Sequence, residues 1–282
     1  MPDQATELRK LVLRAAREAT LEVGPPPRLL VLTGGKGGVG VTTIAVNLSI
    51  ALADQGTRVV LVDADLHRAD VATLCGLPEQ RSVADVLTSR RDIHEVLVRG
   101  PAGIQIVPGL WAPGNVADYS EKSQLRLLRQ LRLLGPHADI VVVDVGGGSN
   151  EVVRRFWQAA DDVLLVTTPD AVAVMDAYAT IKTLRAGGDI ERMRLIVNSA
   201  RNVGEAADVH RRLDQSCQRF LGCSLGLLGH LPPDEAVTLA SRQAAPFVSA
   251  ATGDAAQALM QFATILAAEN SDSRKRHTRA AA

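Results

Sequence analysis

Residues 29–43, LLVLTGGKGGVGVTT, are the part of the chain most indicative of its architecture. It begins with a short aliphatic run, continues through a glycine-rich segment, and leads into the mostly apolar residues Ile44 to Leu48. A strand, a glycine loop and a helix in this order form a phosphate cradle, because successive backbone N–H groups and a helix N-terminus converge on phosphate oxygens. A glycine-rich turn without a ligand is the alternative. The loop residues expected to hold phosphate are Gly35, Gly37, Gly38, Val39, Gly40, Val41, Thr42 and Thr43.

Valine stands at position 41, where a loop of the GxxxxGK[ST] pattern carries lysine. That lysine makes charge-assisted hydrogen bonds to phosphate worth about 1.5 to 3 kcal/mol. Its loss predicts an affinity for nucleotide lower by roughly one to two powers of ten, and a larger loss of rate, because phosphoryl transfer depends on positioning and electrostatics. Both hydroxyls remain: Thr42 suits Mg²⁺, and Thr43 would face the α-phosphate.

From Arg28 onward, short β-branched runs alternate with helical segments, which predicts an α/β fold with a mostly parallel twisted sheet and helices on both faces. Several runs end in a polar residue, namely Thr33, Asp63, Asp144 and Asn198. Open α/β sheets bind ligands at the carboxyl ends of their strands, so we expect these side chains at the ligand site. The expected strands are residues 29–33, 59–63, 104–108, 140–144, 163–168, 195–198 and 227–231.

The chain divides into four parts. Residues 3–23 have helical periodicity with Asp3 as N-cap, and residues 24–27, Gly-Pro-Pro-Pro, form a stiff linker. Residues 28–268 form the α/β domain, which ends in an apolar helix over 254–268. Residues 269–282, which include four basic side chains, are expected to be a disordered tail.

Composition narrows the class of protein. The 282 residues are 46% apolar, and 31 basic residues balance 31 acidic ones, so no global field favours DNA or anionic membrane. The cysteines Cys75, Cys217 and Cys223 form no CxxC pair, which indicates a reducing compartment and disfavours an iron–sulfur reductase. The six histidines have no metal-ligand spacing. We expect a cytoplasmic protein without a specific nucleic-acid partner.

Residues 28–268 resemble the MinD/ParA group of P-loop ATPases, whose altered phosphate loop reads KGGxGK[ST]. Lys36 matches the signature lysine that reaches across a nucleotide-sandwich dimer. The resemblance implies ATP or ADP with Mg²⁺ as cofactors, and it places Thr42, Asp63 and Asp144 near the metal and Asp65 at the attacking water. It also implies adenine contacts from Asn198 and from the loop containing Pro232 and Asp234. Taken from the residues alone, Asn198 equally fits a turn after a strand, and the prolines a stiffened loop.

Within this group the likeness is strongest to the FlhG (FleN) branch. The segments 63–66, 74–77 and 175–182 follow its pattern, and residues 3–9, DQATELR, reproduce its DQAxxLR motif. The resemblance implies docking on an FlhF-type GTPase through this motif. Its residues Asp3, Gln4, Ala5, Leu8 and Arg9 begin a helix with an amide, an apolar strip and a guanidinium on one side. An amphipathic helix packed on its own domain is the alternative reading.

The leading hypothesis is an FlhG-like regulator of flagellar number and placement, with an impaired ATP site and a GTPase-activating terminal helix. A competent ATPase that cycles between monomer and ATP-bound dimer is the second hypothesis, and a nucleotide-free scaffold the third. Flagellar basal-body proteins are further expected partners. Contact with the inner face of the membrane is expected to be weak or to pass through a partner, because the basic tail has no hydrophobic face.

Overall fold

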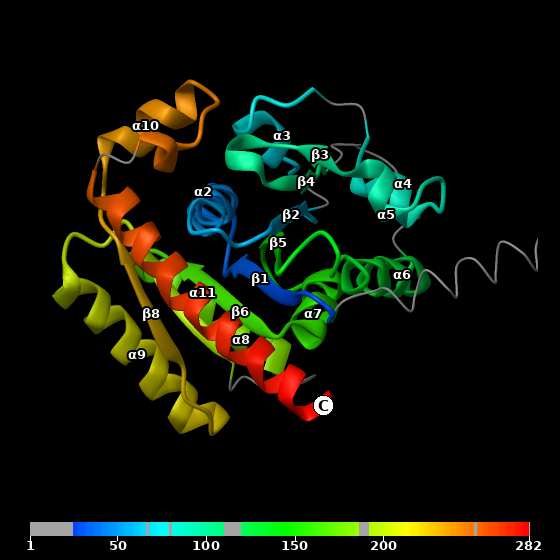
Figure 1. Ribbon diagram of the computed structural model, residues 1–282. Helices are drawn as coiled ribbons and strands as arrows, with labels where there is room; N and C mark the ends of the chain where they lie inside the picture. The colour runs from blue at the N-terminus through cyan, green and yellow to red at the C-terminus, as the bar shows by residue number, and fades with distance from the viewer. Residues whose placement is uncertain are drawn as a thin grey trace, which may run out of the picture.

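The computed structural model describes residues 25–65, 68–78, 81–109, 120–185, 192–250 and 253–281. Its centre is an eight-stranded sheet in the order β3-β4-β2-β5-β1-β6-β7-β8, in which only the β3–β4 pair is antiparallel (Figure 1). The strands are β1 (Arg28–Gly34), β2 (Val59–Asp63), β3 (Val98–Arg99), β4 (Gln105–Val107), β5 (Ile140–Gly147), β6 (Asp162–Thr167), β7 (Met193–Asn198) and β8 (Gly226–Leu231). The mostly parallel sheet and all seven expected strands are confirmed. The two-residue β3 is too short to leave a pattern in the sequence.

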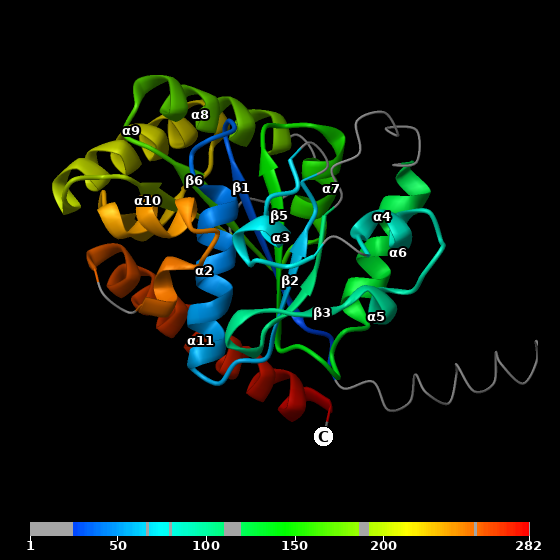
Figure 2. The same ribbon diagram turned by 90° about the horizontal axis from the view of Figure 1, so that it is seen from above.

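Helices cover both faces of the sheet, and Figure 2 shows α2 and α11 on one side and α8 on the other. The first layer contains α2 (Val41–Asp54), α3 (Val71–Leu74), α10 (Glu235–Arg242) and α11 (Asp254–Ala281) with the short turn η4 (Phe247–Ala250). The second contains α4 (Val83–Leu87), α5 (Ile93–Val96), α6 (Glu121–Arg132), α7 (Glu151–Ala159), α8 (Ala171–Arg185) and α9 (Val203–Leu221). A 3₁₀ turn, η2 (Pro101–Gly103), precedes β4.

The central strands are apolar on both sides because each side meets a layer of helices. In β1, Leu29 and Val31 belong to the core beneath α6–α9, whereas Leu30 and Leu32 belong to the core beneath α2 and α11. All four are at most 1% exposed. Continuous burial of this kind is typical of parallel strands and explains why β1, β2 and β5 read as aliphatic runs.

The last helix differs from the prediction. We expected it to end at residue 268 before a disordered tail, but α11 continues to Ala281. Glu269 lies 2.9 Å from Arg28 Nη2 and 2.8 Å from Arg194 Nη1, and Arg274 pairs with Asp139. Ion pairs with charged residues at the amino edge of the sheet therefore hold the extension. These partners are far away in the sequence, so the composition of residues 269–282 alone could not reveal them.

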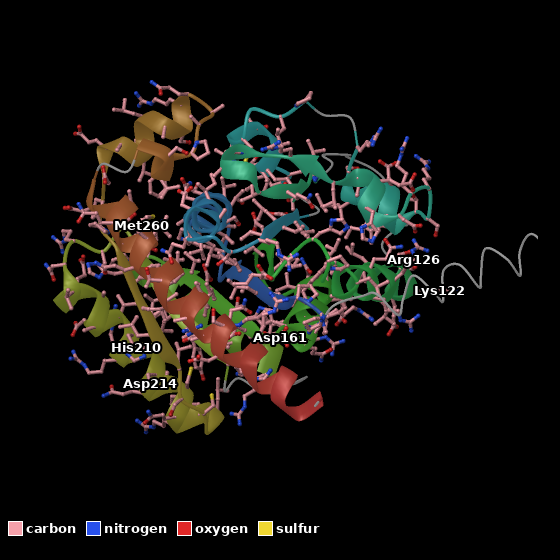
Figure 3. The ribbon with its side chains drawn as sticks, viewed as in Figure 1. Lys122, Arg126, Asp161, His210, Asp214 and Met260 are labelled. Atoms are coloured by element: carbon pink, nitrogen blue, oxygen red, sulfur yellow. The ribbon has the colours of Figure 1, made fainter. Side chains whose placement is uncertain are left out.

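The start of β1 is fixed at the same edge. Asp161, labelled in Figure 3, accepts hydrogen bonds from Leu29 N at 2.7 Å and from Arg132 Nη1 at 2.6 Å. Pro27, at the end of the expected linker, is buried, and its carbonyl accepts from Arg132 at 3.4 Å. In the part of the chain that the structure describes, no helix combines the length and apolar run needed to cross a bilayer.

Candidate functional site

The phosphate loop joins β1 to α2 at the carboxyl edge of the sheet. Gly38 and Gly40 have φ of +83° and +98°, a region that favours glycine, and Gly40 is the N-cap of α2. Gly35 lies so close to α8 that an added Cβ would be 2.3 Å from Ala177 N. The loop is therefore pressed between two helices, with the N-terminus of α2 at its end. This arrangement is the geometry of an anion cradle.

The side chain of Val41 is buried, and it places no charge at the phosphate loop. Its side chain is 6% exposed and belongs to the apolar core together with Leu32, Val39 and Ile44. A Cβ added to Gly34 would lie 3.0 Å from Val41 Cγ2. Position 41, which carries lysine in the P-loop pattern, thus holds an apolar residue that packs the loop onto the core.

Lys36 has a different partner. Its Nζ lies 3.5 Å from Asp170 Oδ1, and the two side chains are 38% and 57% exposed. Asp170 also accepts from Ala173 N at 2.9 Å at the start of α8, and this backbone bond comes first among the causes that lower the pKa of its carboxyl. The sequence analysis did not single out Asp170, although it shortly follows a predicted strand and precedes a helix, a typical N-cap position.

Asp63 ends β2 and stands opposite Asp144 in the β2–β5 register. The strand of Asp144 was expected to end at that residue, but β5 continues to Gly147. Asp63 and Asp144 are 1% and 0% exposed. Burial, and then the charge of Asp144, raise the pKa of Asp63 well above its ordinary value. Burial likewise raises the pKa of Asp144 to about 6, although the Thr42 hydroxyl and the Gly146 N–H act in the opposite direction. Two carboxyl groups are thus held together in an environment that disfavours their charges.

These groups fit a magnesium ion. Asp144 Oδ1 accepts from Gly146 N at 2.9 Å, whereas its buried Oδ2 has no hydrogen-bond partner among the described residues. Mg²⁺ prefers oxygen ligands, and one or two carboxylates with a hydroxyl and phosphate oxygens are its usual protein set. Thr42, Asp63 and Asp144 would hold the ion, which would neutralise phosphate charge. A bound cation would also remove the cost of ionising the two carboxyl groups.

Asp65 lies against the last residues of β5. A Cβ added to Gly146, whose φ is +69°, would be 2.1 Å from Asp65 Oδ2. Asp65 Oδ1 accepts from Arg68 N at 3.1 Å. Arg68 pairs through its side chain with Asp70 at 3.2 Å and is 74% exposed. The structure brings Asp65 to the carboxylate pair, and its role at the attacking water stays a prediction.

The expected base side is a separate pocket of about 200 Å³. Its lining includes Thr43, Asn198, Pro232 and Asp234, and also Ser199, which the sequence analysis did not single out. Asp234 is largely committed to structure: its Oδ1 accepts from Ala236 N at 2.9 Å and its Oδ2 from Ala255 N at 3.3 Å. It therefore joins α10 to α11 at the pocket wall. Its predicted contact with nucleotide remains untested.

The partner-binding residues Asp3, Gln4, Ala5, Leu8 and Arg9 lie outside the described residues. The structure therefore brings together the phosphate-loop, carboxylate and base-pocket residues at one edge of the sheet, and it does not test the terminal motif. Lys36 and Gly37 are also close to the end of β5, since a Cβ on Gly147 would lie 2.5 Å from Lys36 O and 2.8 Å from Gly37 N.

Comparison with known proteins agrees with this geometry. A family model described as an AAA domain matches residues 28–192. The antiactivator FleN of Pseudomonas aeruginosa is 38% identical over 212 residues, which cover 75% of this chain and 76% of FleN. The septum site-determining protein MinD of Bacillus subtilis is 31% identical, covering 77% of this chain and 80% of MinD. The flagellum site-determining protein YlxH of Helicobacter pylori is 28% identical, with coverage of 76% and 72%.

Solved structures share the fold. MinD of Pyrococcus horikoshii, determined in complex with Mg-ADP, superposes with a TM-score of 0.71 at 22% identity and covers 85% of this chain and 96% of that one. MinD of Pyrococcus furiosus gives the same TM-score and identity, with coverage of 84% and 97%. The sheet order, the phosphate loop, the paired carboxylates and these likenesses agree. The chain belongs to the MinD/ParA family of P-loop ATPases.

Proposed function

We propose that this chain is an FlhG-like regulator of flagellar number and placement. It binds an FlhF-type GTPase through residues 1–23 and stimulates GTP hydrolysis, while its own site binds ATP or ADP with Mg²⁺ weakly. The observation that carries the proposal is the 38% identity with the antiactivator FleN over three quarters of the chain. The likeness to a flagellum site-determining protein supports the same direction. Flagellar basal-body proteins are further candidate partners.

The impaired site is supported by the burial of Val41. A side chain that is 6% exposed and packed with Leu32 and Ile44 supplies neither charge nor a hydrogen bond to phosphate. In this proposal the backbone cradle still holds phosphate, and Thr42, Asp63 and Asp144 still hold Mg²⁺. Binding therefore survives better than turnover, because turnover needs charge neutralisation in the transition state.

The terminal motif supplies the activating role in this proposal. In a helix, Gln4, Leu8 and Arg9 share a side, so an amide and a guanidinium can reach a partner's nucleotide together. An amide can orient an attacking water, and an arginine can pair with phosphate or with an acidic side chain. Through Arg9 the motif would thus supply the GTPase with a positive charge, whereas the chain's own phosphate loop lacks the lysine charge at position 41.

The experiment is GTP hydrolysis by an FlhF-type GTPase with added full chain, or with a chain that begins at Arg28. We expect stimulation with the full chain and the basal rate with the shortened one. Gln4→Ala and Arg9→Ala should lower stimulation strongly, and Lys10→Ala, which changes a different side of the expected helix, should lower it little. Equal stimulation by the shortened chain would refute the proposal.

The second candidate is a competent ATPase that cycles between monomer and ATP-bound dimer. The assembled Asp63, Asp65 and Asp144 favour it, because a chain without turnover has no need of a residue at the attacking water. Steady release of phosphate that disappears in Asp65→Ala would support this candidate. Absence of release above background in the unmodified chain would exclude it.

A further inference from the structure

Asn198 connects two parts of the site that are far apart in the sequence. Its Nδ2 donates a hydrogen bond to Val39 O at 2.8 Å, across 159 positions of the chain. Val39 is 2% exposed and lies in the middle of the phosphate loop. A Cβ added to Gly40 would be 2.4 Å from Asn198 Nδ2. The amide therefore lies directly against the residue that caps α2.

The backbone holds Asn198 in this position. Asn198 ends β7, where it pairs with Leu231 of β8, and Ala200 N donates to Leu231 O at 3.1 Å. Between them Ser199 has a φ of +58°, a left-handed conformation that non-glycine residues rarely adopt. The surrounding pairing maintains this strained turn, so the position of the Asn198 amide is set before any ligand binds.

One amide can serve both the loop and a base. An asparagine side chain has two N–H donors and one carbonyl acceptor, and the bond to Val39 uses a single donor. No other side-chain hydrogen bond of Asn198 occurs within the described ranges, and the residue lines the 200 Å³ pocket beside Thr43. The second N–H and the carbonyl oxygen thus remain for a ligand in that pocket.

We propose that Asn198 is a positioning residue for the phosphate loop, in addition to any contact with a base. It holds the Val39 carbonyl, keeps the backbone donors of residues 37–42 in register, and so couples recognition of the base to recognition of the phosphates. The inference rests on the proposed function only in treating this site as a nucleotide site. It gains weight from Val41, because a loop without lysine depends on the geometry of its backbone N–H groups.

The first test uses the unliganded full-length protein. Amide hydrogen exchange is measured across residues 39–44, where Ile44 N donates to Gly40 O at 2.9 Å. In Asn198→Ala we expect exchange there to be faster by about two- to tenfold, the factor that corresponds to loss of one hydrogen bond. Asn198→Asp keeps the shape but presents an oxygen to the Val39 carbonyl, so it should be at least as fast. Val237→Ala, which trims another residue lining the pocket, is the control and should leave this exchange unchanged.

The second test distinguishes an effect of Asn198 on the phosphate loop from a contact with the base. It uses inorganic tripolyphosphate, which has no base. In a Val41→Lys background, Asn198→Ala should weaken binding of both ATP and tripolyphosphate in the presence of Mg²⁺, each by about fivefold or more. Val237→Ala should weaken the binding of ATP but not the binding of tripolyphosphate. Thermal unfolding of each variant shows whether the loop effect exceeds any global loss of stability.

Two results would overturn the inference. One is exchange at residues 39–44 that is the same in Asn198→Ala, Asn198→Asp and the unmodified chain. The other is a loss of ATP affinity without any loss of tripolyphosphate affinity, which would make Asn198 a contact for the base alone. Because the exchange measurement needs neither nucleotide nor GTPase, its outcome is independent of the GTPase experiment on residues 1–23.

Discussion

Among single residues, Val41 deserves the first test, because it stands where the P-loop pattern carries lysine. We expect Val41→Lys to tighten binding of MgATP by about tenfold to a hundredfold, because it restores charge-assisted hydrogen bonds to phosphate. Isothermal titration calorimetry measures the change directly. Val41→Met is the matched control, since it replaces the branched side chain with a flexible one and adds no charge. Equal gains in both variants would show that loop packing, and not charge, limits affinity.

A second prediction concerns how Asp144, one of the paired carboxyl groups, affects stability at different pH. The pKa of Asp144 is raised from 3.8 to about 6, so in the metal-free protein the folded state binds a proton more tightly than the unfolded state. Its contribution to stability is therefore greatest at low pH and declines as the pH rises from about 4 through about 6. At pH 7.5 in EDTA, Asp144→Asn should raise the free energy of unfolding by about 2 kcal/mol.

Urea denaturation at pH 4 and at pH 7.5 tests this expectation. The difference between Asp144→Asn and the unmodified chain should shrink at the lower pH, where the native carboxyl is protonated. Asp70→Asn, at a side chain that is 47% exposed, is the control and should change little at either pH. A destabilised Asp144→Asn at pH 7.5 would mean that the carboxylate is held by a favourable interaction in the metal-free protein.

At the scale of elements, the sequence predicts what depends on local pattern. The aliphatic runs identify the strands, and the rule for parallel sheets brings Asp63 and Asp144 to one edge, which the β2–β5 register confirms. The bond from Ala255 N to Asp234 joins residues 21 positions apart, and the pairing of Glu269 with Arg28 joins residues 241 apart. Such partners meet only after the sheet has formed, so neither the wall of the base pocket nor the length of α11 could be read from the sequence.

The extension of α11 can be tested through Glu269. Burial opposes its ionisation, but Arg28 and Arg194 outweigh that effect, so the pKa of Glu269 is lower than its ordinary 4.5. A lowered carboxyl pKa adds stability above pH 4.5, and this contribution is lost as the pH falls through the pKa of the folded state. Glu269→Gln should therefore cost about 1 kcal/mol at pH 7, a modest figure because the side chain is 41% exposed.

Chemical denaturation at pH 7 and pH 3 measures the effect, which should be smaller at pH 3 than at pH 7. Hydrogen exchange should also accelerate in α11 beyond residue 268 while the start of the helix is unchanged. Asp208→Asn breaks an exposed ion pair with Arg211 on α9 and serves as the control, with little expected change. An unaltered C-terminal half of α11 in Glu269→Gln would show that packing alone orders it.

In the whole molecule, the carboxyl and amino edges of the sheet hold different groups of residues. The carboxyl edge holds the phosphate loop, the carboxylates and the base pocket, whereas the amino edge holds the start of β1 and the end of α11 through arginine–carboxylate pairs. β1 links them directly, since Arg28 begins the strand and the phosphate loop follows Gly34. The described residues 25–27, which lead into β1, therefore lie at the edge opposite the phosphate loop.

The carboxyl edge also exposes apolar side chains beside Lys36. Val172 and Met175, in the first turns of α8, are 57% and 71% exposed. A second copy placed over this edge would cover them and bring Lys36 toward the other subunit's phosphates. We expect the unmodified chain to remain monomeric with MgATP at micromolar concentration, because weak phosphate binding leaves little free energy for association. Val41→Lys should instead form a dimer, seen as a doubled mass by light scattering.

Two further variants decide whether this dimer uses the predicted face. In the Val41→Lys background, Lys36→Ala should remove the dimer because its Nζ can no longer reach the partner's nucleotide. Met175→Glu should also remove it, by placing a charge in the covered apolar surface, while leaving affinity for ATP in the monomer nearly unchanged. Val203→Glu, at a side chain that is 71% exposed at the start of α9, shows how far the interface extends. The prediction is that, without a lysine at position 41, MgATP binding does not drive dimer formation. It would be refuted if the unmodified chain formed a dimer with MgATP as completely as Val41→Lys does.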